Sequence, residues 1–144
     1  MRRRSLAVLC LELKSASALA QTWPTRIIWS GFEIGVALRY LHQSLERYYN
    51  YVDHQPLKGA YYAYNPSPHD RPIWDLTSVL YAIRPNQHYF GFLKSGNVPI
   101  DKTGLTHFRE TKNEQQHLKL NASQMIRVKE TLAGLASQPP NKSI

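Results

Sequence analysis

The run from Arg26 to Ser30 constrains the fold of this chain more than any other segment. Its middle residues are β-branched or aromatic, which is typical of a β-strand. Ile27 and Ile28 are adjacent apolar residues, whereas a strand with one face in water would alternate apolar and polar residues. Such a pair indicates a strand covered on both faces, as in the parallel sheets of α/β proteins.

The segments beside this strand fit the same architecture. Residues 15–21 are rich in Ala and Leu and predict a short helix, which ends before Pro24 because proline disfavours α geometry in the preceding residue. Gly31 breaks the strand, and a loop is expected at 30–35. Helix, proline turn, buried strand and glycine loop predict an α/β fold, in which ligands bind beyond the carboxyl ends of strands.

The rest of the chain alternates between helical and strand patterns. The clearest helix is predicted at 76–83, where Leu76, Val79, Leu80 and Ile83 recur at helical spacing. We also predict helices at 40–51, 57–64 and 122–136, the last capped by Asn121. The segments 89–93, 97–101 and 105–109 predict a small β-meander, and 115–120 predicts a further strand.

The 144 residues amount to one domain. Apolar residues make up 42% of the chain and charged residues 19%, which is too apolar for a disordered tail and too polar for a membrane protein. The single cysteine, Cys10, excludes an internal disulfide and a cysteine-based zinc cage. We expect an irregular leader at 1–14, one domain at 15–136 and a polar tail at 137–144.

The first 20 residues imitate a signal peptide, with Arg2–Arg4 before an apolar stretch and small residues at 18–20. The apolar stretch Leu6–Leu11 has only six residues before Glu12, which is short for the apolar core of an export signal. We therefore favour a helix docked on the domain over export, and a cytoplasmic location over an exported one.

The net charge of +8 comes from 18 Lys and Arg against 10 Asp and Glu, and a basic chain can bind anionic partners. Apart from Arg2–Arg4, however, the basic residues are spread singly along the chain. The tyrosines between residues 48 and 62 have helical spacing, which favours core and rim positions over stacking on bases. Nucleic-acid binding is therefore the least supported function class.

Two acidic residues are candidate site residues. Asp75 follows the stiff loop 70–74 at the start of the predicted helix, where spacing alone favours a helix N-cap over a carboxylate that faces a cleft and a hard cation. Glu33 lies between Gly31 and Gly35, where it either lines a pocket or forms a surface ion pair. The six histidines lack metal-binding spacing, so we expect solvated or packing roles for them.

Two long strings resemble a known family. The first is Trp23-Pro-Thr-Arg-Ile-Ile-Trp-Ser-Gly-Phe-Glu-Ile-Gly35, and the second is Asp70-Arg-Pro-Ile-Trp-Asp-Leu-Thr-Ser-Val-Leu-Tyr-Ala-Ile-Arg84. Together they are similar to the carboxyl-terminal part of the inosine/uridine-preferring nucleoside hydrolases, in the bacterial branch of that family. The turn-rich segment 89–108 is also similar, so the resemblance covers most of the chain.

The resemblance implies a Rossmann-like open α/β sheet and hydrolysis of the N-ribosidic bond of purine and pyrimidine nucleosides. In this family a calcium ion binds the ribose hydroxyls and a water, and an aspartate takes that water's proton. The family's late calcium-binding aspartate matches Asp75, which favours the metal role. Many members have a histidine that assists the leaving base where this chain has Trp74, which cannot donate a proton but can stack on a base. Glu33 lies in the matching loop as a pocket residue.

One part of the family pattern is not matched in this chain. The family opens with an aspartate cluster, Asp-x-Asp followed by Asp-Asp, which supplies the catalytic base and most calcium ligands. No catalytic residue is therefore identifiable here, and Asp75 alone gives a calcium ion too few of its usual 6–8 oxygen ligands. We expect the carboxyl-terminal portion of a domain whose amino-terminal half is missing, impaired on its own.

A second hypothesis is a non-catalytic remnant, an interaction protein that pairs with a separate amino-terminal half. A sheet without its early strands exposes an edge and apolar faces, so self-association is also expected. The expected partners are a nucleoside substrate and either the missing half or a second copy, with no membrane and no nucleic acid.

Overall fold

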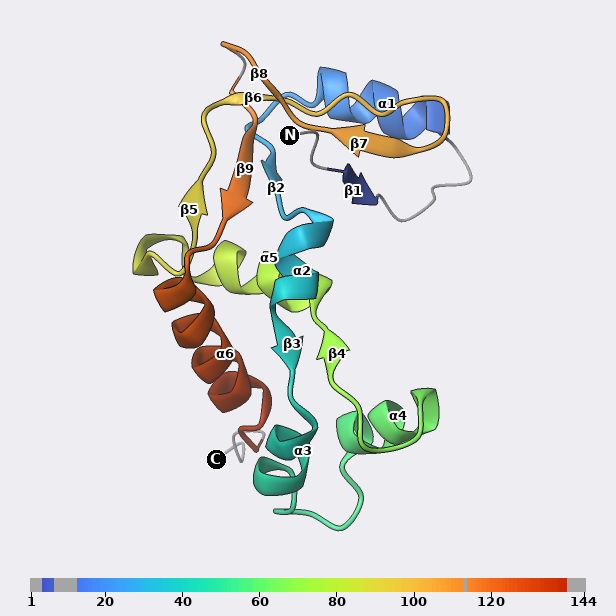
Figure 1. The fold of residues 1–144 in the computed structure, drawn as a ribbon, viewed down its shortest axis with the longest axis vertical. Coiled ribbons are helices and arrows are strands. Elements are labelled where there is room, and N and C mark those ends of the chain that lie inside the picture. The colour runs from blue at the N-terminus through green and yellow to red at the C-terminus, as the bar shows by residue number, and fades with distance from the viewer. Residues whose placement is uncertain (1–3, 7–12, 113, 140–144) are drawn as a thin grey trace.

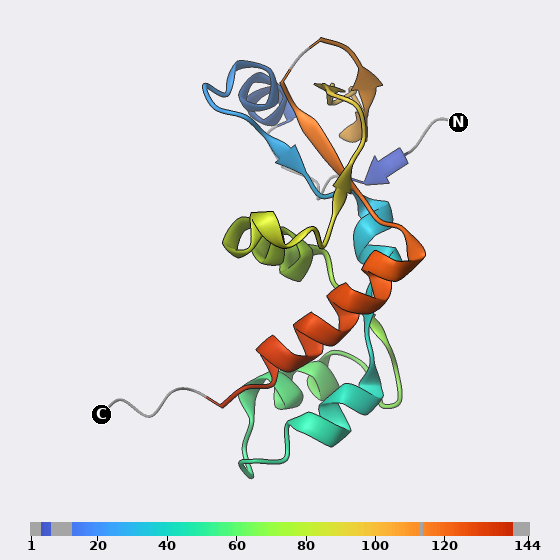
Figure 2. The same ribbon diagram turned by 90° about the vertical axis from the view of Figure 1, so that its left-hand side faces the viewer.

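The computed structural model describes residues 4–6, 13–112 and 114–139, which form an elongated mixed α/β structure. A three-stranded sheet lies toward one end, and helices α3 (His42–Tyr48) and α4 (Pro56–Tyr64) lie at the other (Figures 1 and 2). Helix α6 (Ala122–Ala136) extends from the sheet toward α3. None of the helices in the described part of the chain has the length and apolar character that a membrane crossing needs.

The three-stranded sheet has β9 (Gln116–Lys119) at its centre. Strand β2 (Ile28–Trp29) pairs with β9 in parallel, and β5 (Gly91–Phe92) pairs with it antiparallel. The strands predicted around 28 and 117 are confirmed, but the sheet is mixed rather than parallel. Strand β2 lies at its edge, and Ile27 and Ile28 are only half-buried, so the predicted cover on both faces of this strand is wrong.

The predicted meander is correct for two of its three segments. Strands β6 (Gly96–Asn97) and β8 (Arg109–Glu110) pair antiparallel, and a bridge between Ile100 and Thr106 continues the same register, so 96–110 is one hairpin. The segment 89–93 instead supplies β5, which pairs with β9. The alternating pattern predicts a strand but does not specify its partner, and in the structure Phe92 of β5 lies opposite the buried Leu118 of β9.

The expected leader is not wholly irregular, since β1 (Arg4–Leu6) pairs antiparallel with β7 (Leu105–His107). Residues 7–11 of the apolar stretch, Cys10 among them, lie outside the described residues, as do residues 140–144 of the predicted tail. Helix α1 (Leu13–Thr22) confirms the helix predicted at 15–21 and ends just before Trp23, although it begins inside the expected leader.

Helix α2 (Phe32–Ala37) occupies most of the loop expected at 30–35. Gly31 precedes it in extended conformation, and Glu33 in its first turn is favourably placed at the positive end of a helix. The other predicted helices are confirmed, although α3 is shorter than its predicted range; Asn121 caps α6 in a capping box with Gln124.

The core lies where α2, α5 (Trp74–Ile83) and α6 meet the sheet and strand β3 (Arg39–Tyr40). On α5, Leu80 is buried, but Val79 and Ile83 are 53% and 61% exposed, so only part of the predicted apolar stripe packs. The buried core residues are Ile34, Leu38, Tyr40, Leu45, Tyr49, Ile73, Leu80, Phe90, Leu118, Val128 and Leu132.

Candidate functional site

Asp75 lies in the first turn of α5, as its second residue. The N-cap position belongs to Ile73, and no side chain caps the helix, so the N-cap role considered for Asp75 is wrong. The Asp75 side chain is exposed, and no hydrogen bond or ion pair joins its carboxylate to another described residue. A carboxylate in the first turn is stabilised by the helix dipole, and this one is available to a ligand.

Trp74 is the first residue of α5, a helix that lies beside α2 (Figure 1). Its indole N–H donates to the Phe32 carbonyl at 3.2 Å, and the two rings stack with centroids 5.7 Å apart. The indole lies directly over Gly35, where an added Cβ would be 2.2 Å from Trp74 Cδ1. Gly35 therefore permits α2 and α5 to approach this closely, which fixes the direction of the Trp74 side chain.

A chain of hydroxyl groups anchors the first turn of α5 to the end of β2. Thr77 is fully buried, and its hydroxyl donates to the Trp74 carbonyl at 2.6 Å. Because that uses the only hydroxyl proton of Thr77, the Ser30 hydroxyl, 2.8 Å away, is the donor between the two side chains. These two hydrogen bonds fix the first turn of α5, which carries Asp75, to the end of β2.

Asp75 and Trp74 lie on the wall of a cavity of about 280 Å³. Three tyrosines, Tyr40, Tyr49 and Tyr61, are among its lining residues. Tyr40 and Tyr49 share a hydrogen bond of 3.0 Å, and burial raises the pKa of both phenols above the usual value. They are therefore neutral at physiological pH. The charged residues that line the cavity are Asp75 and Arg71, and the Arg71 guanidinium lies over the Tyr64 ring, 3.5 Å from its centroid. The cavity is aromatic, with one free carboxylate at its wall.

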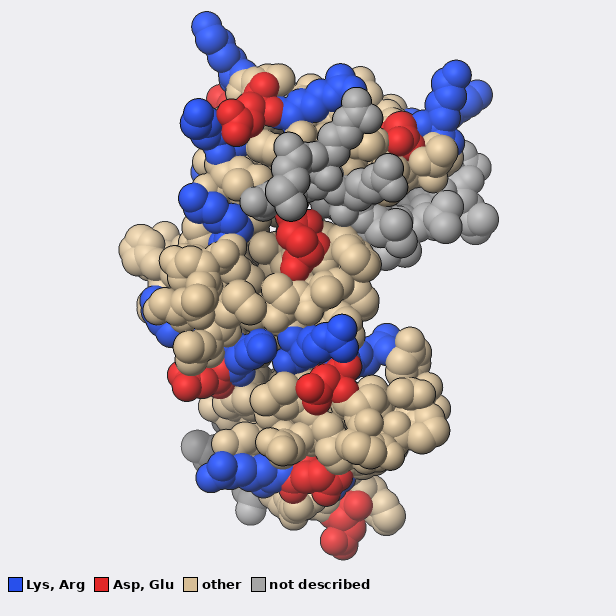
Figure 3. All heavy atoms as spheres, in the orientation of Figure 1, with Lys and Arg blue, Asp and Glu red and all other residues tan. Residues whose placement is uncertain are grey.

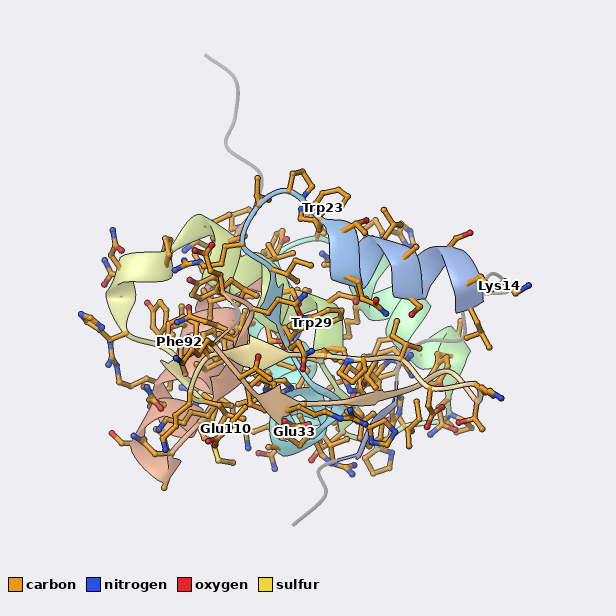
Figure 4. The ribbon with its side chains drawn as sticks, turned by 90° about the horizontal axis from the view of Figure 1, so that it is seen from above. Lys14, Trp23, Trp29, Glu33, Phe92 and Glu110 are labelled. Carbon is orange, nitrogen blue, oxygen red and sulfur yellow. The ribbon has the colours of Figure 1, made fainter. Side chains whose placement is uncertain are left out.

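Glu33 does not line this cavity. Its carboxylate lies 3.6 Å from Nε2 of His117 on β9, a side chain that is almost fully buried. The other ring nitrogen of His117 donates to the Leu118 carbonyl at 2.9 Å, and the ring meets Phe108 edge-on. Glu33 is labelled in Figure 4, which views the molecule from above. The structure therefore places Glu33 in a contact between α2 and the sheet, apart from Asp75.

His117 is a buried polar residue that sequence reasoning assigned no role beyond packing. A signal for it lies in Gly31, since a Cβ there would come within 2.6 Å of both the His117 ring and the Glu33 carboxylate. A glycine directly after a strand thus indicates that side chains from elsewhere in the fold pack closely against the backbone at that position. The sequence does not specify which residue approaches, because His117 is far along the chain.

The described residues supply one of the oxygen ligands that a calcium ion needs, but they do not form a complete calcium site. No group of three or more histidine, cysteine, aspartate or glutamate side chains in the described part of the chain is placed to hold a metal ion. Asp75 supplies one exposed carboxylate of the type that calcium prefers, but calcium takes 6–8 oxygen ligands. Asp75 would therefore hold the ion only together with ligands from outside these residues.

A second carboxylate, Asp101, is used within the hairpin. It accepts hydrogen bonds from His107 at 2.8 Å and from the Thr103 hydroxyl at 2.6 Å, and these bonds hold its pKa well below the usual value. Gly104 completes the turn with φ of 82°, a left-handed conformation that favours glycine. Asp101 is therefore a turn residue rather than a candidate ligand.

This arrangement predicts a pH dependence of stability. Because the folded pKa of Asp101 is depressed, its contribution is complete above its ordinary pKa and is lost as the pH falls below it. We expect Asp101→Asn to be less stable than wild type at pH 7, and the difference to shrink below about pH 4. Urea unfolding from pH 7 to pH 3 measures this, with Asp53→Asn as an exposed control outside the hairpin. A difference that stays constant across that range would contradict the assignment.

Comparison with protein-family models, with curated proteins and with solved structures found no match for this chain. The class that the structure defines is thus a mixed α/β protein with small sheets and an aromatic cavity beside one free carboxylate.

Proposed function

We propose that this chain is the carboxyl-terminal portion of a nucleoside hydrolase-like protein, which cleaves the N-ribosidic bond of purine or pyrimidine nucleosides together with an amino-terminal half. The observation that carries this proposal is the exposed Asp75 carboxylate, which has no hydrogen-bond or ion-pair partner among the described residues, on the wall of the aromatic cavity. Half of the residues that line this cavity, 71–76, belong to the second string that resembles the family.

The chemistry follows from glycoside hydrolysis in general. The bond between the ribose C1′ and the base nitrogen breaks, and a water oxygen bonds to C1′. One proton of that water goes to a general base, the other stays on the new C1′ hydroxyl, and the departing nucleobase takes up one proton. The sugar carries positive charge in the transition state, which a nearby carboxylate stabilises. A bound calcium ion would polarise the water and orient the ribose hydroxyls.

In this scheme the residues of this chain bind and orient the substrate. Asp75 supplies one ligand to the ion and faces the ribose, and Trp74, held by Phe32, offers an indole face on which the nucleobase stacks. Trp74 has no proton to give at neutral pH, so the leaving base takes its proton from elsewhere. The general base is assigned to the amino-terminal half.

The proposal predicts activity only from the two halves combined. The chain is incubated with inosine or uridine and calcium, alone and with a separately expressed amino-terminal portion of a bacterial nucleoside hydrolase that carries the aspartate cluster. We expect release of free base from the mixture and none from either part. A stable complex without base release would contradict the hydrolase assignment and favour the non-catalytic remnant.

The surface gives no specific support to nucleic-acid binding. On the face shown in Figure 3, acidic side chains lie among the basic ones instead of leaving a continuous basic patch. Two salt bridges, Lys58–Glu46 and Lys94–Glu110, likewise pair a basic side chain with an acidic one.

A further inference from the structure

We infer that a second cavity, between α3, β3 and α6, is a binding site for a small organic carboxylate, a molecule with one carboxylate group on an apolar body. This cavity has a volume of about 370 Å³, which lies within the roughly 300–1,000 Å³ of small-molecule sites. It is separate from the cavity of Asp75, although Tyr40 and Ile73 line both. The inference goes beyond the proposed function and does not depend on it.

Three elements form the walls of this cavity, which we call the α6 cavity. Strand β3 contributes Arg39, helix α3 contributes Ser44 and Tyr48, and α6 contributes residues 129, 130 and 132–134. Figures 1 and 2 show α6 extending past β3 toward α3. Residues 129 and 133 are about one helical turn apart, so they lie on one face of α6. The site is thus built on regular elements, which hold side chains more precisely than loops do.

The inner wall of the α6 cavity is apolar and belongs to the core. Tyr40, Ile73 and Leu132 all line the cavity, and each is nearly fully buried. The Tyr40 hydroxyl is already bonded to the hydroxyl of Tyr49 at 3.0 Å. Because core packing holds these side chains, the wall is formed before a ligand arrives, and it suits the apolar part of a ligand.

Two basic side chains at this cavity have no partner. No hydrogen bond or ion pair joins the Arg39 guanidinium or the Lys129 ammonium group to another described residue. Lys129 is nevertheless half-buried, and partly buried charges are screened less by water and salt than exposed ones. The Ser44 hydroxyl, also without a partner among the described residues, adds an uncharged donor. An anion would therefore find unused donors beside an apolar wall.

The charges at the cavity favour a ligand with a single negative charge. The two positive charges of Arg39 and Lys129 against the one negative charge of Glu130 leave the lining with +1. Arg47, whose guanidinium lies 5.4 Å from the centroid of the Tyr48 ring, adds positive charge next to the lining. Figure 3 shows basic side chains across the middle of the molecule, at the level of β3 in Figure 1. A guanidinium binds a carboxylate through two parallel hydrogen bonds, so Arg39 is the expected anchor.

The binding of phenylacetate to the full chain tests the chemistry of the site. Titration calorimetry at low ionic strength compares it with phenylacetamide, which has the same body without the charge, and with acetate, which lacks the apolar body. We expect phenylacetate to bind about tenfold or more tightly than either. Equal affinities for phenylacetate and phenylacetamide would show an apolar cavity without preference for an anion, and would overturn the inference.

Substitutions then test the residues. Lys129→Met removes the charge and keeps most of the alkyl chain, and Arg39→Met does the same on β3. We expect each to weaken phenylacetate binding by about tenfold and to leave phenylacetamide binding within about threefold of wild type. Lys112→Met is the matched control, because Lys112 is exposed, lies outside the lining and has no partner among the described residues either. Circular dichroism checks that the variants fold. Equal losses in the Lys112 and Lys129 variants would show non-specific attraction and contradict the site.

Amide NMR signals locate the bound ligand. We expect phenylacetate to shift the signals of Ser44 and Lys129 more than that of Asp75. Shifts that are largest at Asp75 would place the ligand in the other cavity and overturn the inference. None of these measurements uses a nucleoside, calcium or a second polypeptide, so a failure here is distinguishable from a failure of the proposed hydrolase.

Discussion

Asp75→Asn should reduce base release by the two-part complex by about 10²-fold or more, the scale seen when one electrostatic group is removed from a preorganised site. Asparagine keeps the shape of the side chain but removes the negative charge that both a cation and a developing oxocarbenium ion require. Since the Asp75 carboxylate has no hydrogen-bond or ion-pair partner among the described residues, the fold should lose little. Initial rates with inosine measure the effect.

The matched control is Asp53→Asn, which removes the same charge from an exposed position that does not line the Asp75 cavity. Because it raises the net charge by the same one unit, any loss through long-range electrostatics would appear in both variants. We expect the control to retain the wild-type rate. Comparable rates for the Asp75 and Asp53 variants would remove Asp75 from the site.

Gly35→Ala should destabilise the chain by about 1–3 kcal/mol, the usual cost of inserting a methyl group into a packed contact. The new Cβ would lie 2.2 Å from Trp74 Cδ1, and the indole cannot move freely because it stacks on Phe32 and bonds its carbonyl. Either the indole or α2 must shift, so the direction of Trp74 should change as well. Urea unfolding measures the stability, and tryptophan fluorescence reports the indole environment.

Two comparisons make this prediction specific. Gly59 in α4 has no atom within 4 Å of an added Cβ, so Gly59→Ala should be neutral or stabilise the helix by up to about 1 kcal/mol. Combining Gly35→Ala with Trp74→Ala should cost less than the sum of the single changes, because the clash disappears with the indole. Strict additivity would show that the Gly35–Trp74 contact does not limit the approach of α2 to α5.

The sequence predicts the elements whose signals are local. Helix α6 follows from the Asn121 cap and its apolar stripe, and α4 from the run at 57–64, which the prolines after Asn65 end. Asp75 could likewise be placed at the start of a helix, although it lies two residues after the N-cap, Ile73, instead of at the N-cap itself. These inferences use residues within a few positions of one another.

Features that depend on distant residues were not predictable in this way. Nothing local shows that Glu33 lies beside His117, or that the indole of Trp74 covers Gly35. Helix α2 was missed because a six-residue helix after a glycine has too little periodicity to distinguish it from a loop. Each of these contacts is decided by packing between elements rather than by the pattern within one.

The exposed pair Val79 and Ile83 on α5 shows the opposite case, in which the sequence predicts burial and the structure leaves both side chains in solvent. The half-buried Ile27 and Ile28 of β2 behave similarly. Both departures have one physical account, since apolar side chains patterned for an interior remain exposed where a packing partner is not among the described residues.

The most direct test of this account is a crystal structure of the two-part complex grown with calcium and ribose. The account predicts an Asp75 carboxylate oxygen bonded to the ion, at the roughly 2.3–2.6 Å usual for calcium, with the sugar between it and Trp74. A bound ion held entirely by the other polypeptide, with Asp75 turned to solvent, would contradict it.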